Sequence, residues 1–247
     1  MSVVPLPLVL VHAFPMGTGM WKTQVAAVTD RRVIVPRLPG FDGHLRLAEP
    51  TMDGYARDLL ATLDREGVTR AVFCGLSLGG YVLFGVLRQA PERVAGLVLA
   101  DTRTTIDTPE RLAGRVRSID TVRTKGPSAI ADEMIPGLVS SATHATQPAV
   151  GAEIRRLIEA QSAAAIADGL QAMMTRPDSA AVLGQVHVPT LILVGSDDGI
   201  TPVSDAESMQ HAIPGSRMVV IPGAGHMSNM EAPEEFNKAL QEFLQGL

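Results

Sequence analysis

The sequence predicts an α/β fold, a doubly wound and mostly parallel sheet of about six strands with a helical insert. Short apolar runs alternate with helical stretches along most of the chain, and most runs are apolar without alternation, as in strands covered on both faces. Between Thr102 and Val188 the apolar residues recur only at helical spacing, which indicates the insert.

Six apolar runs end at a glycine, a proline or a polar turn, and these are the predicted strands: Leu6–Val11, Val33–Val35, Ala71–Cys74, Val94–Ala100, Thr190–Val194 and Met218–Ile221. The apolar stretch Val3–Val11 has no positive flank and no small-residue cleavage site. It is also far shorter than the roughly 20 residues that cross a bilayer. We therefore expect a buried strand, a cytoplasmic location and no membrane partner. Val33–Val35 would form an exposed edge unless it is covered or paired in a homodimer.

Helices with apolar residues along one side are expected between the strands, at Asp53–Asp64, Ser77–Gln89 and Pro233–Leu244. Prolines divide the insert into about four short helices. An insert placed between two strands should cover the C-terminal edge of the sheet, where open α/β sheets bind ligands. The expected division is a core of residues 1–101 and 189–247 and a helical cap of residues 102–188.

Composition excludes several classes of protein. Of the 247 residues 46% are hydrophobic and the net charge is −5, which is typical of a globular chain rather than a disordered one. No run of Lys or Arg is present to neutralise phosphates, so nucleic acid is not an expected partner. The single cysteine, Cys74, cannot form an internal disulfide.

The strongest local motif is Gly75-Leu-Ser-Leu-Gly79, directly after a predicted strand and before a predicted helix. A serine is held exposed as a nucleophile by such a sharp strand-to-helix turn, which needs small flanking residues. No lysine follows in the place that a phosphate-binding loop requires. Ser77 is the candidate nucleophile.

His226 lies in a short glycine-rich loop after the last predicted strand, where it can reach the same sheet edge as Ser77. An imidazole accepts and returns a proton near neutral pH. No closely spaced pair of histidines supports a metal site, and no metal or organic cofactor is expected.

The carboxylate that orients His226 is expected in the turn after Thr190–Val194. Asp198 is favoured by its spacing to the following Thr-Pro turn, and Asp197 is expected to be a solvated turn residue. Asp101 is a rival because it also follows a strand. The order Ser77, Asp198, His226 is the one found in hydrolases with this sheet architecture.

An oxyanion hole requires two backbone N–H groups, expected from Leu78, next to the nucleophile, and from Phe14, in the loop after the first strand. His12 is expected to brace this loop. Candidate substrate-binding residues near these loops are Met16, Trp21 and Met227.

Five segments together resemble the α/β-hydrolase superfamily: HAFPMGTGMW, CGLSLGGY, LVLADT, VPTLILVGSDDGITP and IPGAGHMSNMEAPEEFN. Within it the chain is similar to small bacterial carboxylesterases, 3-oxoadipate enol-lactonases and cofactor-free haloperoxidases. The resemblance implies the same roles for Ser77, His226 and Asp198, oxyanion donors at Phe14 and Leu78, and a helical cap. Two departures are expected: a sheet without the N-terminal hairpin that is usual in relatives, and a differently shaped loop where Ala13 replaces the usual glycine.

The expected function is a serine hydrolase that cleaves small carboxylic esters through an acyl-enzyme intermediate. An enol-lactonase of the 3-oxoadipate type is an alternative, and it would need Arg103, Arg123 or Arg176 to hold a substrate carboxylate. Peroxide-dependent perhydrolase or haloperoxidase chemistry at the same site is another. From a different class, the chain could be a ligand-binding homologue without turnover.

Overall fold

The computed structural model describes residues 5–247 and contains a six-stranded sheet in the order β2-β1-β3-β4-β5-β6. All neighbouring strands pair in parallel. The strands are β1 (Leu8–Val11), β2 (Val33–Ile34), β3 (Ala71–Leu76), β4 (Val94–Ala100), β5 (Thr190–Gly195) and β6 (Arg217–Ile221). This confirms the predicted sheet. Val3 and Val4 of the N-terminal apolar stretch lie outside the described residues.

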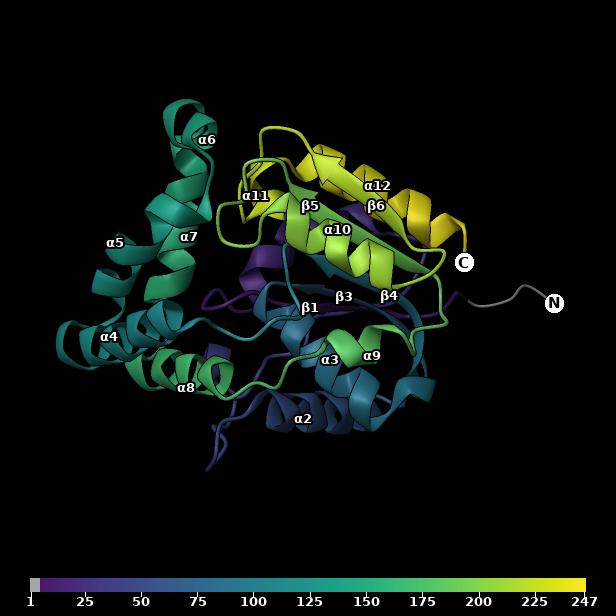
Figure 1. Ribbon diagram of the computed structural model, residues 1–247, viewed down its shortest axis with the longest axis horizontal. Coiled ribbons are helices and arrows are strands. Elements are labelled where there is room, and N and C mark those ends of the chain that lie inside the picture. Colours follow the sequence, from purple (N-terminus) through teal and green to yellow (C-terminus); the bar gives the residue numbers. More distant parts are fainter. Residues whose placement is uncertain (1–4) are drawn as a thin grey trace.

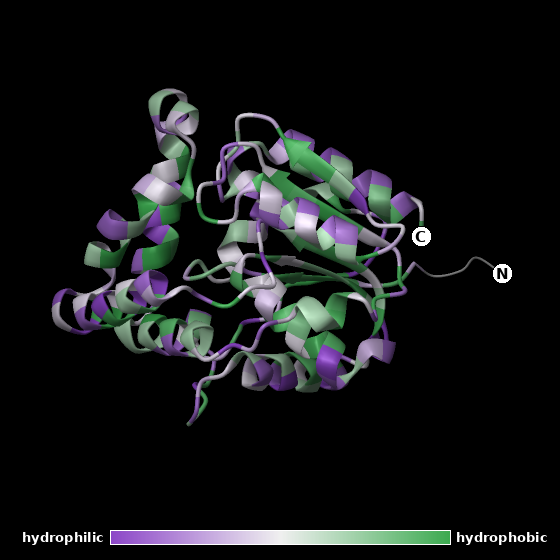
Figure 2. Cartoon of the chain, in the orientation of Figure 1, coloured by the Kyte–Doolittle hydropathy of each residue, from purple (hydrophilic) through white to green (hydrophobic). Residues whose placement is uncertain are grey.

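Helices cover both faces of the sheet, which explains its apolar strands. Every residue of β1, β3, β4 and β5 is buried, and Figure 2 shows hydrophobic residues along the central strands. The core helices are α1 (Lys22–Ala27), α2 (Met52–Arg65), α3 (Leu78–Gln89), α10 (Val203–Ala212), α11 (Ser228–Glu231) and α12 (Pro233–Gln245). α2 packs on α3 and α1 packs on α12, and the sheet lies between these two pairs (Figure 1).

Local sequence explains where the core helices begin. The side chain of Thr51 accepts the N–H of Gly54 at 3.0 Å and caps α2, whose Tyr55, Leu59 and Leu63 are buried. α3 is more deeply embedded, because every residue from Leu78 to Leu87 is buried. The helices predicted at these positions are confirmed to within a few residues.

Every regular element between Thr102 and Val188 is a helix: α4 (Pro109–Lys125), α5 (Pro127–Leu138), α6 (Ser141–Thr146), α7 (Pro148–Glu159), α8 (Ala163–Met174) and α9 (Ala180–Leu183). Three of them begin with a proline, whose missing N–H costs nothing in a first turn. There are six helices rather than about four, because α6 and α9 have only 6 and 4 residues and are too short to show an apolar repeat.

The helices of the insert do not all lie together. α4 packs on α5 and α8, and α7 packs on α5 and α6, so these five helices form one group beside the sheet (Figure 1). α9 instead contacts α3 and α10 of the core. The expected boundary of the cap at residue 188 stays a prediction.

The sheet ends in two edge strands. β2 has two residues, Val33 and Ile34, which are half-buried, so the predicted edge is short and partly covered. β6 pairs only with β5 in the part of the chain that the structure describes. Among residues 5–247, no helix combines the length and the apolar character that a membrane crossing requires.

Candidate active site

Ser77 lies in a tight turn between β3 and α3, with φ 54° and ψ −111°. Two neighbouring glycines make this turn possible. A Cβ on Gly75 would lie 2.6 Å from the backbone carbon of Gly79, and a Cβ on Gly79 would lie 2.2 Å from the carbonyl oxygen of Val11. The turn therefore presses the start of α3 against the end of β1, and it leaves the Ser77 side chain half-exposed.

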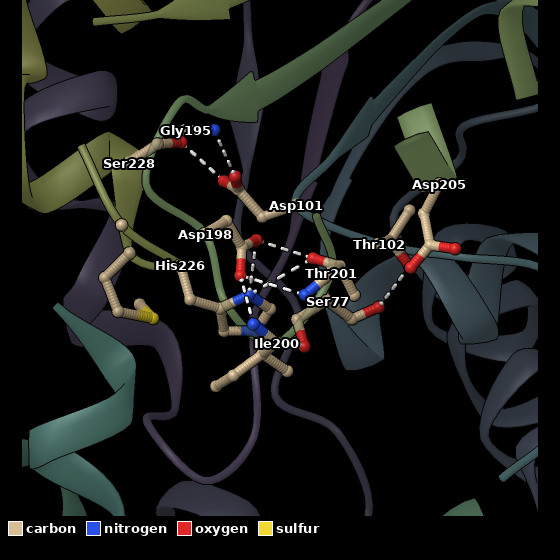
Figure 3. Close-up of polar contacts among 12 residues, drawn as sticks. Ser77, Asp101, Thr102, Gly195, Asp198, Ile200, Thr201, Asp205, His226 and Ser228 are labelled. Atoms are coloured by element: carbon tan, nitrogen blue, oxygen red, sulfur yellow. Dashed lines mark hydrogen bonds and ion pairs between the residues drawn. The ribbon is translucent and has the colours of Figure 1, made fainter. Parts of the chain in front are cut away.

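His226 and Asp198 meet Ser77 at the C-terminal edge of the sheet (Figure 3). The Ser77 hydroxyl lies 2.9 Å from Nε2 of His226, and Nδ1 of the same ring lies 2.8 Å from Oδ2 of Asp198. His226 and Asp198 are 3% and 4% exposed, so this second contact is shielded from water. With Nδ1–H donating to Asp198, Nε2 is the ring atom that accepts the serine hydrogen. The structure thus brings together the three residues that the sequence predicts.

Asp198 is held by the turn that follows it. Its Oδ1 accepts the N–H groups of Ile200 and Thr201 at 2.8 and 2.9 Å, and its Oδ2 accepts the Thr201 hydroxyl at 2.6 Å. Burial raises the pKa of Asp198, but His226 and these hydrogen bonds outweigh burial and hold the pKa below its usual value. Asp198 is therefore set up as an ionised acceptor for the imidazole.

The rival carboxylate, Asp101, has different partners. It accepts the N–H of Gly195 at 2.9 Å and the hydroxyl of Ser228, and among the described residues no hydrogen bond joins it to His226. Burial, followed by the charge of Asp198, raises the pKa of Asp101 well above its usual value. Asp197 is exposed and accepts the Ser196 hydroxyl at 2.8 Å, as expected of a turn residue.

The loop that contains Phe14 follows β1, whose last residue, Val11, lies against Gly79 at the start of α3. The Phe14–Pro15 peptide bond is cis, and the N–H of Met16 donates to the carbonyl of Ala13 at 3.0 Å. Among the described residues no protein acceptor is found for the N–H of Phe14 or Leu78. The assignment of these two amides as oxyanion donors stays a prediction.

His12 is fully buried under the same loop. Its Nδ1 lies 2.9 Å from the carbonyl oxygen of Ala13, and its ring meets Phe41 edge-on with centroids 5.2 Å apart. Burial is the largest influence on the pKa of His12 and lowers it. These contacts are those of a side chain that braces the loop.

The candidate substrate residues lie deep in the core. Met16, Trp21 and Met227 are all 0% exposed, and the Trp21 ring packs on Phe236 with centroids 6.0 Å apart. Their assignment to the substrate stays a prediction. A cavity of about 320 Å³ lies between the segment around Trp21, α7 and α11. It is lined by Gly19, Met20, Lys22, Thr23, Ala149, Val150, Glu153 and Met230.

Two threonines of the site were missed by the sequence argument. Thr201 donates to Asp198 and also lies 3.3 Å from Nδ1 of His226. The hydroxyl of Thr102 donates to the carbonyl oxygen of Ser77 at 2.9 Å. The first could have been found from the Asp-x-x-Thr spacing, which is typical of side chains that bond their own turn. The second depends on two strand ends being adjacent and has no local signal.

The three arginines considered for a substrate carboxylate are placed differently. Arg176 is buried, pairs with Asp107 at 2.9 Å and lies 4.4 Å from the Tyr81 ring centroid. Arg103 is buried, donates to the carbonyl of Ile200 and lies 3.7 Å from Asp205. Arg123 is exposed on α4. No group of three or more His, Cys, Asp or Glu side chains in residues 5–247 is arranged to hold a metal ion.

Comparison with known proteins places this geometry in a family. A solved thermophilic esterase from Thermogutta terrifontis, in a malate-bound structure, is 41% identical with a TM-score of 0.94, and the match covers 98% of this chain and 90% of that one. The 3-oxoadipate enol-lactonase 2 of Acinetobacter baylyi is 26% identical, over 94% of this chain and 86% of that protein.

A third relative is longer than this chain. It is the dihydrolipoyllysine-residue acetyltransferase component of the acetoin cleaving system from Pseudomonas putida, 32% identical over 96% of this chain. The chain spans 63% of that protein, less than two thirds of its length. The family model described as alpha/beta hydrolase family matches residues 8–239. The chain therefore belongs to the alpha/beta hydrolase family.

Proposed function

We propose that the protein is a serine hydrolase that cleaves small carboxylic esters. The observation that carries the proposal is the hydrogen-bonded chain from Ser77 through His226 to Asp198. A serine, an imidazole and a carboxylate in this order form the arrangement that activates a serine hydroxyl. Relatives that match along nearly the whole chain include a named esterase and a named enol-lactonase, which supports an ester hydrolase.

The first half of the reaction makes an acyl-enzyme. The Ser77 oxygen attacks the ester carbonyl carbon while Nε2 of His226 takes the hydroxyl proton. Asp198 keeps the ring oriented and stabilises the imidazolium that forms. In this proposal the N–H groups of Phe14 and Leu78 receive the negative charge on the carbonyl oxygen. The C–O bond to the alcohol then breaks, and His226 returns the proton to the departing alcohol.

The second half uses water. His226 takes a proton from a water molecule, which attacks the acyl carbon and forms a second tetrahedral intermediate at the same amides. The bond to Ser77 breaks, the serine recovers its proton, and the carboxylic acid leaves. Every proton moves through one nitrogen atom of His226, and no cofactor is part of the proposal.

Simple esters are favoured over substrates that carry a carboxylate. An enol-lactone of the 3-oxoadipate type has such a group, and the relative from Acinetobacter baylyi supports that alternative. However, Arg103 and Arg176 are buried with protein partners already in place. Freeing Arg103 for a substrate would leave Asp205 without its cation, and freeing Arg176 would leave Asp107 paired with Arg115 alone. Perhydrolysis at the same serine is a further alternative that no contact specifically favours.

Labelling with a fluorophosphonate, together with hydrolysis of p-nitrophenyl esters of increasing chain length and of an enol-lactone, tests the proposal. We expect stoichiometric labelling, and we expect Ser77→Ala to abolish it and lower kcat by about 10⁴-fold or more. Ser208→Ala removes a hydroxyl from an exposed position of α10. It is the matched control and should keep the wild-type rate. A Ser77→Ala protein that retains most of its esterase activity would overturn the assignment. Wild-type protein that takes up no label would favour a binding protein.

A further inference from the structure

We propose that Glu231 is a positioning residue that holds His226 in the geometry of the reaction. The inference rests on the proposed function, because it takes His226 as the base. Glu231 is the last residue of α11 and is only 4% exposed. Its carboxylate is therefore buried, and its hydrogen-bond partners must offset the free-energy cost of removing it from water.

The partners of one carboxylate oxygen lie on either side of His226. Oε1 accepts the N–H of Gly225 at 3.0 Å and the N–H of Met227 at 3.2 Å. The backbone is thus fastened immediately before and immediately after the histidine. The preceding loop contains Gly223, with φ 71°, and Gly225, so it would be flexible without such a contact.

The other oxygen joins this loop to the insert. Oε2 accepts the N–H of Ser140, between α5 and α6, at 2.8 Å. The N–H of Met227 is shared with the carbonyl of Leu138, at 3.0 Å. A Cβ on Gly225 would lie 2.6 Å from the nitrogen of Ser140, so the two segments are in close contact. One carboxylate therefore connects the insert to both flanks of the histidine.

A carboxylate suits this position better than an amide. All three partners are N–H donors, and two oxygens provide enough lone pairs to accept all of them. A glutamine has only one acceptor oxygen, so its NH2 group would face at least one of these N–H groups. In the described residues no hydrogen bond joins Glu231 to the His226 ring, so we infer that it acts on the base through the backbone.

The expected consequence is kinetic. A displacement of about 1 Å in a catalytic group can cost about 100-fold in rate. Because no hydrogen bond joins the Glu231 carboxylate to Ser77, Phe14 or Leu78 in the described residues, its loss should lower kcat and leave KM within about threefold of wild type. A group that only stabilised the fold would change the folded fraction and leave the rate of each folded molecule as it was.

The test compares Glu231→Ala and Glu231→Gln with wild type in p-nitrophenyl ester hydrolysis and in the rate of fluorophosphonate labelling, each per folded molecule. We expect Glu231→Ala to lose about 100-fold in kcat and in labelling rate, with intermediate losses for Glu231→Gln. Asp107→Asn is the matched control, because it also disrupts a buried carboxylate, and in the described residues its partners Arg115 and Arg176 make no hydrogen bond to the His226 loop. This control should lose stability and keep its kcat.

Each outcome decides one question. Wild-type kcat and labelling rate in folded Glu231→Ala would overturn the positioning role, as would activity that falls only in step with the folded fraction. If Glu231→Ala does not fold, the same criteria apply to Glu231→Gln, measured well below its Tm. If wild-type protein is not labelled at Ser77, the proposed function fails instead, and that result does not depend on any Glu231 variant.

Discussion

Two aspartates at the sheet edge differ in the partners that surround them. Asp198 accepts three hydrogen bonds from its own turn and one from His226, and its pKa is lowered. Asp101 is enclosed at the end of β4 with φ 43°, and burial raises its pKa well above the usual value. The first is suited to orient an imidazole, whereas the second links Gly195 to Ser228 at the end of β4.

This contrast predicts different effects of the same substitution. Asp198→Asn should lower kcat by about 10³- to 10⁴-fold, because an amide cannot hold the imidazole in the required tautomer. Asp101→Asn should stay within about tenfold of wild type, because its oxygen can still accept from Gly195 and its NH2 group can donate to Ser228. Steady-state kinetics with a p-nitrophenyl ester checks both. Equal losses in the two variants would contradict the assignment of Asp198.

At the scale of elements, the strand-turn-helix of β3 and α3 sets the position of Ser77. The turn fits only because Gly79 lets α3 approach the end of β1. The two predicted oxyanion donors, Phe14 and Leu78, belong to the two segments that this approach brings together. Gly79 thus permits a close contact between the start of α3 and the end of β1, which are far apart in the chain.

Gly79→Ala tests this dependence. The added methyl would lie 2.2 Å from the Val11 oxygen, so we expect a loss of about 3 kcal/mol in the free energy of unfolding and a strong fall in kcat. Gly137→Ala in α5 is the matched control, because a Cβ there meets nothing within 4 Å. It should be neutral or stabilising by up to about 1 kcal/mol. Urea denaturation measures both, and a wild-type midpoint for Gly79→Ala would refute the packing argument.

The group of five helices α4 to α8 is also held at both of its ends. Asp107, just before α4, pairs with Arg176, just after α8, at 2.9 Å. Arg115 of α4 joins the same carboxylate at 2.6 Å, and Arg176 lies over the ring of Tyr81 in α3. The chain therefore leaves the core and returns to it through one charged cluster. The neutral balance of nine basic and nine acidic residues in the insert does not reveal this pairing.

At the scale of the whole molecule, these carboxylates shape the dependence of stability on pH. Burial raises the pKa of Asp107, but Arg176 and Arg115 outweigh burial and lower it to about 2. A carboxyl with a lowered pKa stabilises the fold above its usual pKa, and this contribution is lost as the pH falls through the lowered value. Asp101, with a raised pKa, has the opposite effect: stability falls as the pH rises above the usual pKa of an aspartate.

Calorimetry from about pH 2 to pH 8 would separate the two contributions. Asp107→Asn should be less stable than wild type near neutral pH, and its Tm should fall less steeply between about pH 4 and pH 2. Asp101→Asn should lose less stability than wild type as the pH rises from about 4. Profiles parallel to wild type would show that neither carboxyl has a shifted pKa.

The sequence by itself predicted the sheet and two of the residues that meet at its edge. Short apolar runs that end at turn residues are typical of strands in such a sheet, and parallel strands bring their C-terminal ends, with Ser77 and His226, to one side. The serine turn and the histidine loop were recognisable because glycine and strand boundaries mark them locally.

Only the tertiary structure decided which groups support those residues. Whether Asp101 or Asp198 faces the imidazole depends on side-chain directions at neighbouring strand ends, which spacing along the chain does not contain. The contacts of Glu231 with Ser140 and of Asp107 with Arg176 join residues 91 and 69 positions apart. A pattern in the sequence reports local conformation and burial, whereas hydrogen bonds between distant segments exist only once the core has packed and fixed their relative positions.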